Sequence, residues 1–507
     1  MDDPLAIVRS AAREAGGGLY LGQGAGGLCW APPEQSVLVL GPPRSGKTSS
    51  LVVQALITAP GAAVSTSTKP DVLAITARAR GRLGPCWLYD PSGTVVAPPG
   101  VERLRWSPIT SCETWDGARF TSETMVAAGK PSAGRSGGSV SGSGIDDHWS
   151  ERAWVVLATL FHAAALSGAP MSSVVSWVDR HEASPAMDIL ETNQARIAYD
   201  ELAGIAVTDQ REQSGIWSTA SGILAAYHSE TILGSTEGAR FDARAFCDSS
   251  GTLYICAPGR HQEMLRPLVV GLLTEIQDAT YARTAEVDLS GTAGPRAPAG
   301  PRAPTGPGAP AGPGAPAGPG APAGPGTQPP VLFALDEVAN IAPLARLPAM
   351  ASEGGSQGIS LLACLQDFSQ ARVRWGAAAE GFLSTFGTIV VLPGIGDVRT
   401  LEAISLLAGD EEIPTRSVTI EGRARGLGIL GRRWPPGGFL RQMATGAGRP
   451  SYTVAATLRR RLPVDAISRG QQRTAIVLDA TTRAWRLELT PWYAGEPWRS
   501  AVLGPPS

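Results

Sequence analysis

Two kinds of hydrophobic pattern divide this chain into blocks. Short runs that are apolar at nearly every position occur before residue 110 and again after residue 245. Such runs are typical of strands that are buried on both faces of a parallel sheet. Between the two blocks, apolar residues recur at three- and four-residue spacing, which predicts amphipathic helices. The pattern therefore predicts an α/β chain whose sheet is interrupted by an all-helical insertion.

The two apolar blocks predict alternating strands and helices. Strand followed by helix and strand is the usual beginning of a parallel sheet. The first block predicts strands at 36–40, 62–66 and 86–89 and helices at 51–58 and 72–79; the second predicts strands at 251–256, 331–335, 359–366, 388–392, 474–478 and 485–490 and a helix at 265–279.

The insertion covers residues 111–244, and the nucleotide-binding domain that we infer below is formed by segments 36–110 and 245–500. Residues 1–35 read as a small lead-in to the first core strand. Pro185 after Ser184 fits the first position of a helix with a serine cap. Glycine and serine dominate 130–144, where we expect a mobile loop, and a bare tether is favoured over a binding role. Helices of the insertion are expected at 120–128, 149–166, 173–179, 185–203 and 210–229.

A Gly/Pro/Ala repeat occupies residues 291–330. Its glycines alternate between two- and four-residue spacing, whereas a collagen triple helix needs glycine at every third position. We expect a disordered, polyproline-like linker within the nucleotide-binding domain. Neutral length variation in a surface loop is favoured over a role in docking a partner.

Composition narrows the class of protein. The 507 residues carry a formal net charge of −2, so any contact with DNA must come from local patches. All but three of the 43 cationic side chains are arginine. The six cysteines show no C-x-x-C spacing, which favours reduced thiols in a cytosolic protein and gives no zinc site. No signal peptide is apparent, and the longest apolar stretch, 154–166, is too short to span a bilayer.

The strand at 36–40 leads into the sequence Gly41-Pro-Pro-Arg-Ser-Gly-Lys-Thr48, which has the spacing G-x-x-x-x-G-K-[ST]. Backbone amides of such a loop, together with a helix N-terminus, wrap the phosphates of a nucleotide. Lys47 is expected to reach the β and γ phosphates, and the Thr48 hydroxyl to hold Mg²⁺. A chance glycine-rich turn is the alternative, but the preceding strand argues against it. The candidate nucleotide-binding residues are Gly41, Arg44, Ser45, Gly46, Lys47, Thr48 and Ser49.

A second landmark is the apolar run 331–335, which ends in Asp336 and Glu337. ATP hydrolysis needs such acids: Asp336 to orient hydrated Mg²⁺, with Thr48 as the other metal residue, and Glu337 to polarise the attacking water. The next apolar strand ends at Gln366, where a γ-phosphate sensor is expected; an ordinary polar residue at a strand end is the alternative. The candidate catalytic residues are Lys47, Glu337 and Gln366.

Arginine and glycine are frequent in residues 421–449, with Trp434 among them. Clustered arginine with an aromatic residue can hold a sugar-phosphate backbone. A solvated, disordered loop explains the same composition and is slightly favoured.

The order of phosphate loop, helical insertion, acid pair and glutamine strand resembles the TraG/TraD group of type IV secretion coupling proteins, the ATPases that feed DNA into conjugation channels. The resemblance extends to Phe241-Asp242, to 251–258, to 365–370 and to Pro491-Trp492-Tyr493. It implies a RecA-like P-loop fold with an all-α domain that selects a relaxase–DNA substrate, and a homo-hexamer around the DNA. It also implies ATP and Mg²⁺ as cofactors, with roles for Lys47, Thr48, Asp336, Glu337 and Gln366 as given above.

Three features depart from that family. Its members usually begin with membrane helices, and none is predicted here, so we expect that anchoring comes from a separate partner, a membrane anchor or channel protein, or is absent. Many members carry an arginine near position 355 that is proposed to act on the ATP of a neighbouring subunit, whereas this chain has glycine there. Arg346, Arg372 and Arg374 are the candidate substitutes. Thr68-Lys69-Pro70-Asp71 also differs from the family's Asp-Pro-Lys-Gly, which leaves a role for Lys69 open.

The leading hypothesis is an ATP-hydrolysing motor that delivers relaxase-bound, single-stranded DNA to a type IV secretion channel, and that works in the cytoplasm at the inner face of the plasma membrane. A cytosolic double-stranded DNA translocase of the FtsK kind is a second hypothesis, although that group lacks so long a helical insertion. A nucleotide-binding adaptor without turnover is a third, and the intact acid pair argues against it.

Overall fold

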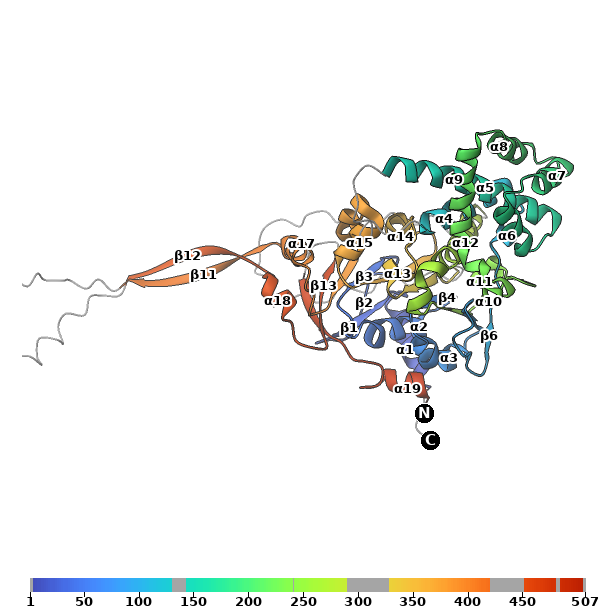
Figure 1. The fold of residues 1–507 in the computed structure, drawn as a ribbon. Coiled ribbons are helices and arrows are strands. Elements are labelled where there is room, and N and C mark those ends of the chain that lie inside the picture. The colour runs from blue at the N-terminus through green and yellow to red at the C-terminus, as the bar shows by residue number, and fades with distance from the viewer. Residues whose placement is uncertain are drawn as a thin grey trace, which may run out of the picture.

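The computed structural model describes residues 3–129, 143–239, 241–289, 328–419, 451–479 and 484–504. A twelve-stranded sheet forms the body of the molecule, with strand order β2-β1-β14-β13-β10-β3-β9-β8-β4-β7-β5-β6. Figure 1 shows helices around this sheet, a group of helices at the upper right, and a two-stranded ribbon that extends far to the left. The two labelled termini lie close together at the bottom of the view.

Eight neighbouring strands, from β10 to β6, are parallel. Their residues are buried at every position of β3, β8, β4 and β7, as expected for a sheet covered on both faces. Leu38 and Leu40 point into one apolar cluster and Val37 and Val39 into another, so the sheet has a core on each face. The predicted α/β fold is confirmed. The eight strands are β10 (Thr388–Val391), β3 (Val37–Leu40), β9 (Ile359–Leu365), β8 (Val331–Leu335), β4 (Ala63–Ser67), β7 (Thr252–Cys256), β5 (Cys86–Tyr89) and β6 (Val101–Arg103).

The other end of the sheet is antiparallel. It consists of β13 (Thr474–Asp479), β14 (Ala484–Glu488), β1 (Tyr20–Gly24) and β2 (Gly27–Trp30). The N-terminal segment was expected to be a small lead-in to the first core strand, and in the structure it supplies two strands to the sheet. The glycines of this segment give no strand signal in the sequence. Gly22 has φ 145°, and a Cβ there would lie 2.9 Å from the carbonyl oxygen of Glu488. The glycine-rich composition permits close pairing with β14.

The helical insertion is present, but several of its helices differ from the prediction: the helix expected at 210–229, for example, ends at Ile223. The single helix expected at 185–203 is two helices, α7 (Ser184–Thr192) and α8 (Arg196–Ala206). Gln194, with φ 58°, reverses the chain between them. Helix α7 begins at Ser184 itself, so the predicted serine cap is wrong and Ala183 precedes the helix without a side-chain bond. The remaining helices of this region are α4 (Trp115–Gly129), α5 (Ser143–Ser167), α6 (Met171–Arg180), α9 (Gln210–Ile223), α10 (Glu230–Gly234) and α11 (Ala243–Asp248).

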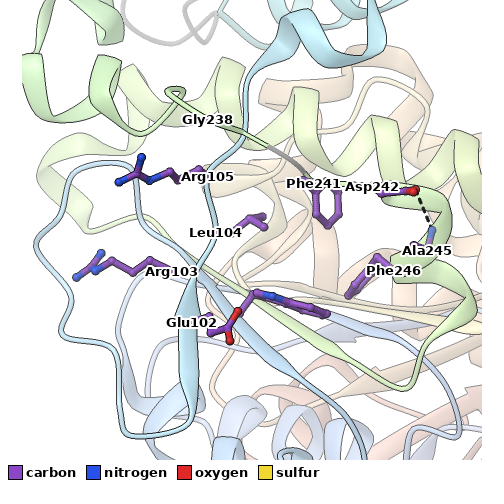
Figure 2. A pocket seen from close by; sticks show the side chains of 10 residues that line it. Glu102, Arg103, Leu104, Arg105, Gly238, Phe241, Asp242, Ala245 and Phe246 are labelled. Atoms are coloured by element: carbon purple, nitrogen blue, oxygen red, sulfur yellow. Dashed lines mark hydrogen bonds between the residues drawn. The ribbon is translucent and has the colours of Figure 1, made fainter.

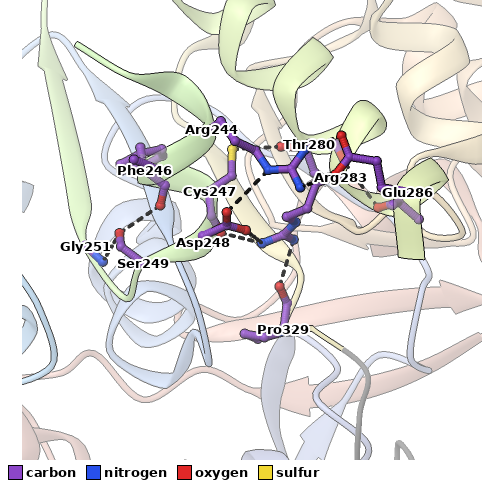
Figure 3. A network of polar contacts seen from close by, with 12 residues as sticks. Arg244, Phe246, Cys247, Asp248, Ser249, Gly251, Thr280, Arg283, Glu286 and Pro329 are labelled. Atoms are coloured by element: carbon purple, nitrogen blue, oxygen red, sulfur yellow. Dashed lines mark hydrogen bonds and ion pairs between the residues drawn. The ribbon is translucent and has the colours of Figure 1, made fainter. Parts of the chain in front are cut away.

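Helix α12 (Gln262–Leu289) follows strand β7 of the sheet and packs against α4 of the insertion. Figure 3 shows the polar network at its C-terminal half. The buried guanidinium of Arg283 donates to the carbonyl oxygens of Cys247 and Pro329, the latter at 3.0 Å. Arg244 of α11 forms an ion pair with Glu286. These bonds connect α11, the end of α12 and the chain just before β8.

Shorter helices complete the sheet's cover. They are α1 (Pro4–Glu14), α2 (Val53–Thr58), α3 (Asp71–Arg80), α13 (Val338–Ile341), α14 (Leu347–Glu353), α15 (Phe368–Trp375), α16 (Phe382–Thr385), α17 (Val398–Ala408), α18 (Val464–Ser468) and α19 (Trp498–Leu503).

An antiparallel ribbon, β11 (Asp410–Thr419) with β12 (Ser451–Arg460), extends from the body beyond α17 (Figure 1). No strands were predicted here. Most of the segments 130–144 and 291–330, and all of 421–449, lie outside the described residues, so the predictions made for them remain predictions. Within the described ranges, no helix is both long and apolar enough to cross a membrane.

Candidate active site

The candidate site lies where three neighbouring parallel strands end. Strand β9 lies between β3 and β8. Leu40 pairs with Leu365, so the carboxyl ends of β3 and β9 are level, and Leu335 pairs with Ala363, so β8 ends two residues earlier. The amide of Gly41 donates to the carbonyl oxygen of Leu365 at 3.1 Å, which fixes the start of the phosphate loop against β9. Ligands of open α/β sheets bind at this edge.

The loop's conformation depends on its glycines. Gly46 has φ 98°, a value that favours glycine, and Arg44 also lies in the left-handed region with φ 64°. A Cβ on Gly41 would lie 2.8 Å from the Ser45 hydroxyl oxygen and 2.9 Å from Cβ of Leu392. The two glycine positions of the spacing pattern are therefore glycine for different reasons: close packing at 41 and backbone conformation at 46.

Lys47 lies inside the loop, with 8% of its surface exposed. Its ammonium nitrogen donates to the carbonyl oxygens of Gly41 and Pro42, the second at 3.0 Å. The cation is thus held over the loop by acceptors that a phosphate oxygen can replace. The first helical residue, Thr48, begins a turn whose leading amides have no acceptor within the helix, which is the usual setting for phosphate binding. The amide of Ser45, in contrast, donates to the carbonyl oxygen of Pro42 at 3.3 Å.

The hydroxyl of Thr48 donates to Oδ2 of Asp336 at 2.7 Å, across 288 residues of sequence. Asp336 is 7% exposed. Burial raises the pKa of its carboxyl group, and the Thr48 hydroxyl and the charge of Lys47 oppose that rise. Hydroxyl and carboxylate oxygens are the hard ligands that Mg²⁺ prefers. The predicted convergence of the phosphate loop and the acid pair is therefore present.

Glu337 turns away from its strand. Its φ of 52° places it in the left-handed region, and its amide donates to Oδ1 of Asp336 at 3.1 Å. Such a conformation in a residue other than glycine costs about 1–3 kcal/mol and is typical of functional sites. Thr66 of β4, which sequence reasoning missed, supports the pair by donating its hydroxyl to the carbonyl oxygen of Asp336 at 3.2 Å. No motif marks Thr66, because only the sheet order brings β4 beside β8.

Gln366 follows β9 directly and therefore lies at the same edge as Gly41. The backbone amide of Gln366 donates to Oε1 of Gln370 at 3.1 Å. The Asp367 side chain caps α15 by accepting from the backbone amide of Ser369 at 2.9 Å. The structure thus gathers Lys47, Thr48, Asp336, Glu337 and Gln366 at three adjacent strand ends. The roles assigned to them remain predictions.

The helix after the loop begins with a π turn, Thr48–Val52, where a regular α-helix was expected. The carbonyl oxygen of Ser49 accepts from the backbone amide of Trp492, outside the helix, at 2.9 Å and from the side-chain Nε2 of Gln54, within it, at 3.1 Å. Nε2 of Gln54 also donates to the carbonyl oxygen of Thr490 at 3.0 Å. The C-terminal segment is thereby attached to the phosphate-loop helix, a contact that no local sequence signal announces.

The three candidate arginines have separate partners in the described structure. The Arg346 guanidinium lies 4.5 Å from the centre of the Phe120 ring. Arg372 pairs with Asp397 at 2.9 Å. Nε of Arg374 donates to the carbonyl oxygen of Ala339 at 2.8 Å, in the helix that follows the acid pair.

Position 355 cannot hold the family's arginine in this chain. A Cβ on Gly355 would lie 1.9 Å from the carbonyl oxygen of Glu34. The departure at 355 therefore has a packing cause.

Lys69 is exposed, and its backbone amide donates to the Ser67 hydroxyl at 3.2 Å.

A cavity of about 410 Å³ lies far from the phosphate loop, beside the edge strand β6. Five strands separate β6 from β3, which is roughly 30 Å at normal strand spacing. Figure 2 shows Phe241, Phe246, Arg103 and Arg105 around it. Asp242 in this cavity caps α11 by accepting from the amide of Ala245 at 2.9 Å, so the Phe241-Asp242 motif begins a helix. The cavity is not part of the phosphate-loop site.

Comparisons with known proteins agree with this arrangement. Residues 5–290 match the family model described as type IV secretory system conjugative DNA transfer, and residues 330–433 match the model described as the TraM recognition site of TraD and TraG. No match was found among curated protein sequences.

Among solved structures, the chain is similar to the unbound bacterial conjugative coupling protein TrwBdeltaN70, with a TM-score of 0.62 and 15% identity over 96% of this chain and 92% of that one. It is also similar to TrwB in complex with the ATP analogue ADPNP, at 16% identity and a TM-score of 0.58, over 90% of this chain and 86% of that one. TrwB with ADP and Mg²⁺ matches at the same identity and score, over 90% and 85%. These structures share the fold described here.

Proposed function

The chain belongs to the type IV secretory system conjugative DNA transfer family, whose model matches more than half of its 507 residues, and from this premise we propose that it is an ATP-hydrolysing coupling protein that delivers relaxase-bound DNA to a type IV secretion channel. The observation that carries the proposal is the bond between Thr48 and Asp336, which brings the phosphate loop and the acid pair to one point. The TrwB complexes with ADPNP and with ADP and Mg²⁺ support ATP and Mg²⁺ as the ligands.

The described side chains fit a Mg²⁺–triphosphate. Thr48 and Asp336 would hold the metal, either directly or through its water, and Lys47 would exchange its two carbonyl acceptors for phosphate oxygens. The metal would neutralise charge on the β and γ phosphates. Glu337 follows Asp336 and has a left-handed backbone conformation. It would orient and polarise water for in-line attack. Gln366, at the end of the intervening strand, would contact the γ-phosphate.

Assembly belongs to the same proposal. Phosphoryl transfer in such enzymes commonly uses an arginine supplied by a neighbouring subunit. Gly355 has no room for one, and Arg346, Arg372 and Arg374 remain candidates. A homo-hexamer around single-stranded DNA is the arrangement that the family resemblance implies.

The test is steady-state phosphate release by the full chain, with and without single-stranded DNA. Lys47→Ala and Glu337→Gln are each expected to lose about 100-fold or more of the rate, the range for removing a group that acts in the transition state. Glu353→Gln is the matched control, because its side chain is exposed and it precedes β9, at the opposite end of that strand from the site. Unchanged turnover in both test variants would refute the assignment.

The alternatives separate in the same assay. An adaptor without turnover would bind ATP but release no phosphate under either condition. A double-stranded DNA translocase of the FtsK kind would be stimulated by duplex in preference to single strands, measured at fixed salt because phosphate contacts make binding strongly salt-dependent. The family match spans the entire helical insertion, which favours the coupling protein over the translocase.

A further inference from the structure

The turn formed by residues 491–494 lies against the start of the phosphate-loop helix. Trp492 donates its amide to the carbonyl oxygen of Ser49 at 2.9 Å, and Ser49 directly follows Thr48. The amide of Ala494 donates to the carbonyl oxygen of Pro491 at 2.9 Å and closes the turn. The backbone of this distant segment is thus fixed one residue from the candidate Mg²⁺ ligand.

A buried glutamine provides a second connection. Gln54 is fully buried, and its Nε2 donates both to Ser49 and to Thr490, at 3.1 and 3.0 Å. Two hydrogen bonds therefore join the C-terminal segment to the phosphate-loop helix, from Trp492 to Ser49 and from Gln54 to Thr490. The carbonyl of Ser49 lies in a π turn, a local irregularity that is frequent at functional sites.

The turn presents an aromatic surface next to the loop. Trp492 is half-buried against the apolar cluster beneath the helix, whereas Tyr493 is 53% exposed. The two rings lie 5.6 Å apart between centroids, with planes at 88°, so Trp492 supports Tyr493 edge to face. The exposed ring of Tyr493 is thus held in place at the start of the phosphate-loop helix. An exposed aromatic face can stack on any nucleobase.

We propose that Tyr493 forms the nucleobase side of the nucleotide site. Its ring stacks on the base of the nucleoside triphosphate, and residues 41–48 bind the phosphates. Trp492 and Gln54 act as positioning residues: the first supports the tyrosine ring, and the second fixes the turn to the helix. The inference rests on the proposed function and deepens it. Stacking tolerates every base, so the site takes nucleoside triphosphates as a class.

Inorganic tripolyphosphate separates the two halves of such a site, because it has the phosphates of ATP but no base. The experiment measures Kd for ATP and for tripolyphosphate, each with Mg²⁺, by calorimetry on the full chain. The variants are Tyr493→Ala and Tyr493→Phe, with Tyr199→Ala, a partly exposed tyrosine of α8, as the control.

Tyr493→Ala is expected to weaken ATP binding about 5- to 150-fold, the value of one base–aromatic stack, and to leave tripolyphosphate within about twofold. Tyr493→Phe should restore ATP binding, and Tyr199→Ala should match the unmodified protein for both ligands. Equal ATP affinity in Tyr493→Ala overturns the inference, and so does an equal loss for both ligands, which would show a purely structural effect on the loop. If the unmodified protein binds neither ligand, the proposed function fails instead.

Discussion

The parallel and antiparallel ends of the sheet contribute to the candidate site in different ways. The parallel strands β3, β9 and β8 supply Lys47, Thr48, the acid pair and Gln366 from their own carboxyl ends. The antiparallel end, through β14 and the segment after it, supplies backbone and aromatic contacts to the outside of the same helix. The first contribution is chemistry encoded in short motifs. The second contribution depends on packing between distant segments, and only the assembled sheet reveals it.

The largest expected change in stability comes from the contact between the N-terminal segment and the parallel half of the sheet, at Gly355 and Glu34. Gly355→Ala should destabilise the protein by about 3 kcal/mol, because its Cβ would overlap the backbone of Glu34 and overpacking typically costs 1–3 kcal/mol. Denaturant unfolding measures the change. Gly222→Ala is the control: it lies in α9 with open space around it, and alanine there should stabilise by about 0.5–1 kcal/mol. Equal stability of the two variants would contradict the described contact.

The two ends also differ in their response to pH. Burial raises the pKa of Glu275 on α12 to about 7, although the Trp106 indole donates to it at 2.7 Å. At the antiparallel end, burial raises the pKa of Tyr20 to about 12, so that group stays neutral below pH 10. The parallel half is therefore where a pH-dependent loss of stability is expected.

For Glu275, the folded state favours the protonated acid, so its contribution to stability is complete below about pH 4.5 and is lost as the pH rises through about 7. Glu275→Gln keeps an acceptor for Trp106 and carries no charge. It should equal the unmodified protein at pH 4.5 and be more stable at pH 8, by roughly 3 kcal/mol at most. Melting temperatures across this range measure the effect. A constant difference at every pH would show that the carboxyl does not titrate there.

The smallest expected effect concerns the connection between the two ends. Gln54→Leu removes the bonds to Ser49 and Thr490 and should reduce the free energy of unfolding by about 1–2 kcal/mol. It should also weaken ATP binding more than tripolyphosphate binding, because the turn that positions Tyr493 is released. Gln213→Leu, in the distant helix α9, controls for the loss of a glutamine that bonds two carbonyls. An identical change in both ligands' affinity would contradict the connection.

The sequence predicted the parallel strands well, because fully apolar runs leave few alternatives for elements buried on both faces. It also predicted the convergence of Lys47, Thr48 and Asp336, because phosphate and metal chemistry require those side chains at fixed spacing. It missed β1 and β2, whose glycines serve close strand pairing rather than turns. It did not predict the contacts of Thr66 with Asp336 and of Trp492 with Ser49, because these contacts depend on the order of strands in the sheet. The break at Gln194 inside an apolar periodicity was hidden for a similar reason, since helical spacing continues across it.

The central claim is that Thr48 and Asp336 hold one metal–triphosphate, and a double-mutant cycle on metal–nucleotide affinity tests it most directly. Electron paramagnetic resonance of Mn²⁺ in place of Mg²⁺, in the presence of ATP, gives that affinity for the unmodified protein, Thr48→Ala, Asp336→Asn and the double variant. Each single variant should weaken Mn²⁺–ATP binding at least tenfold, and the double variant should be little worse than either, because both side chains act on the same ion. Fully additive losses, or unchanged affinity in either single variant, would contradict the claim.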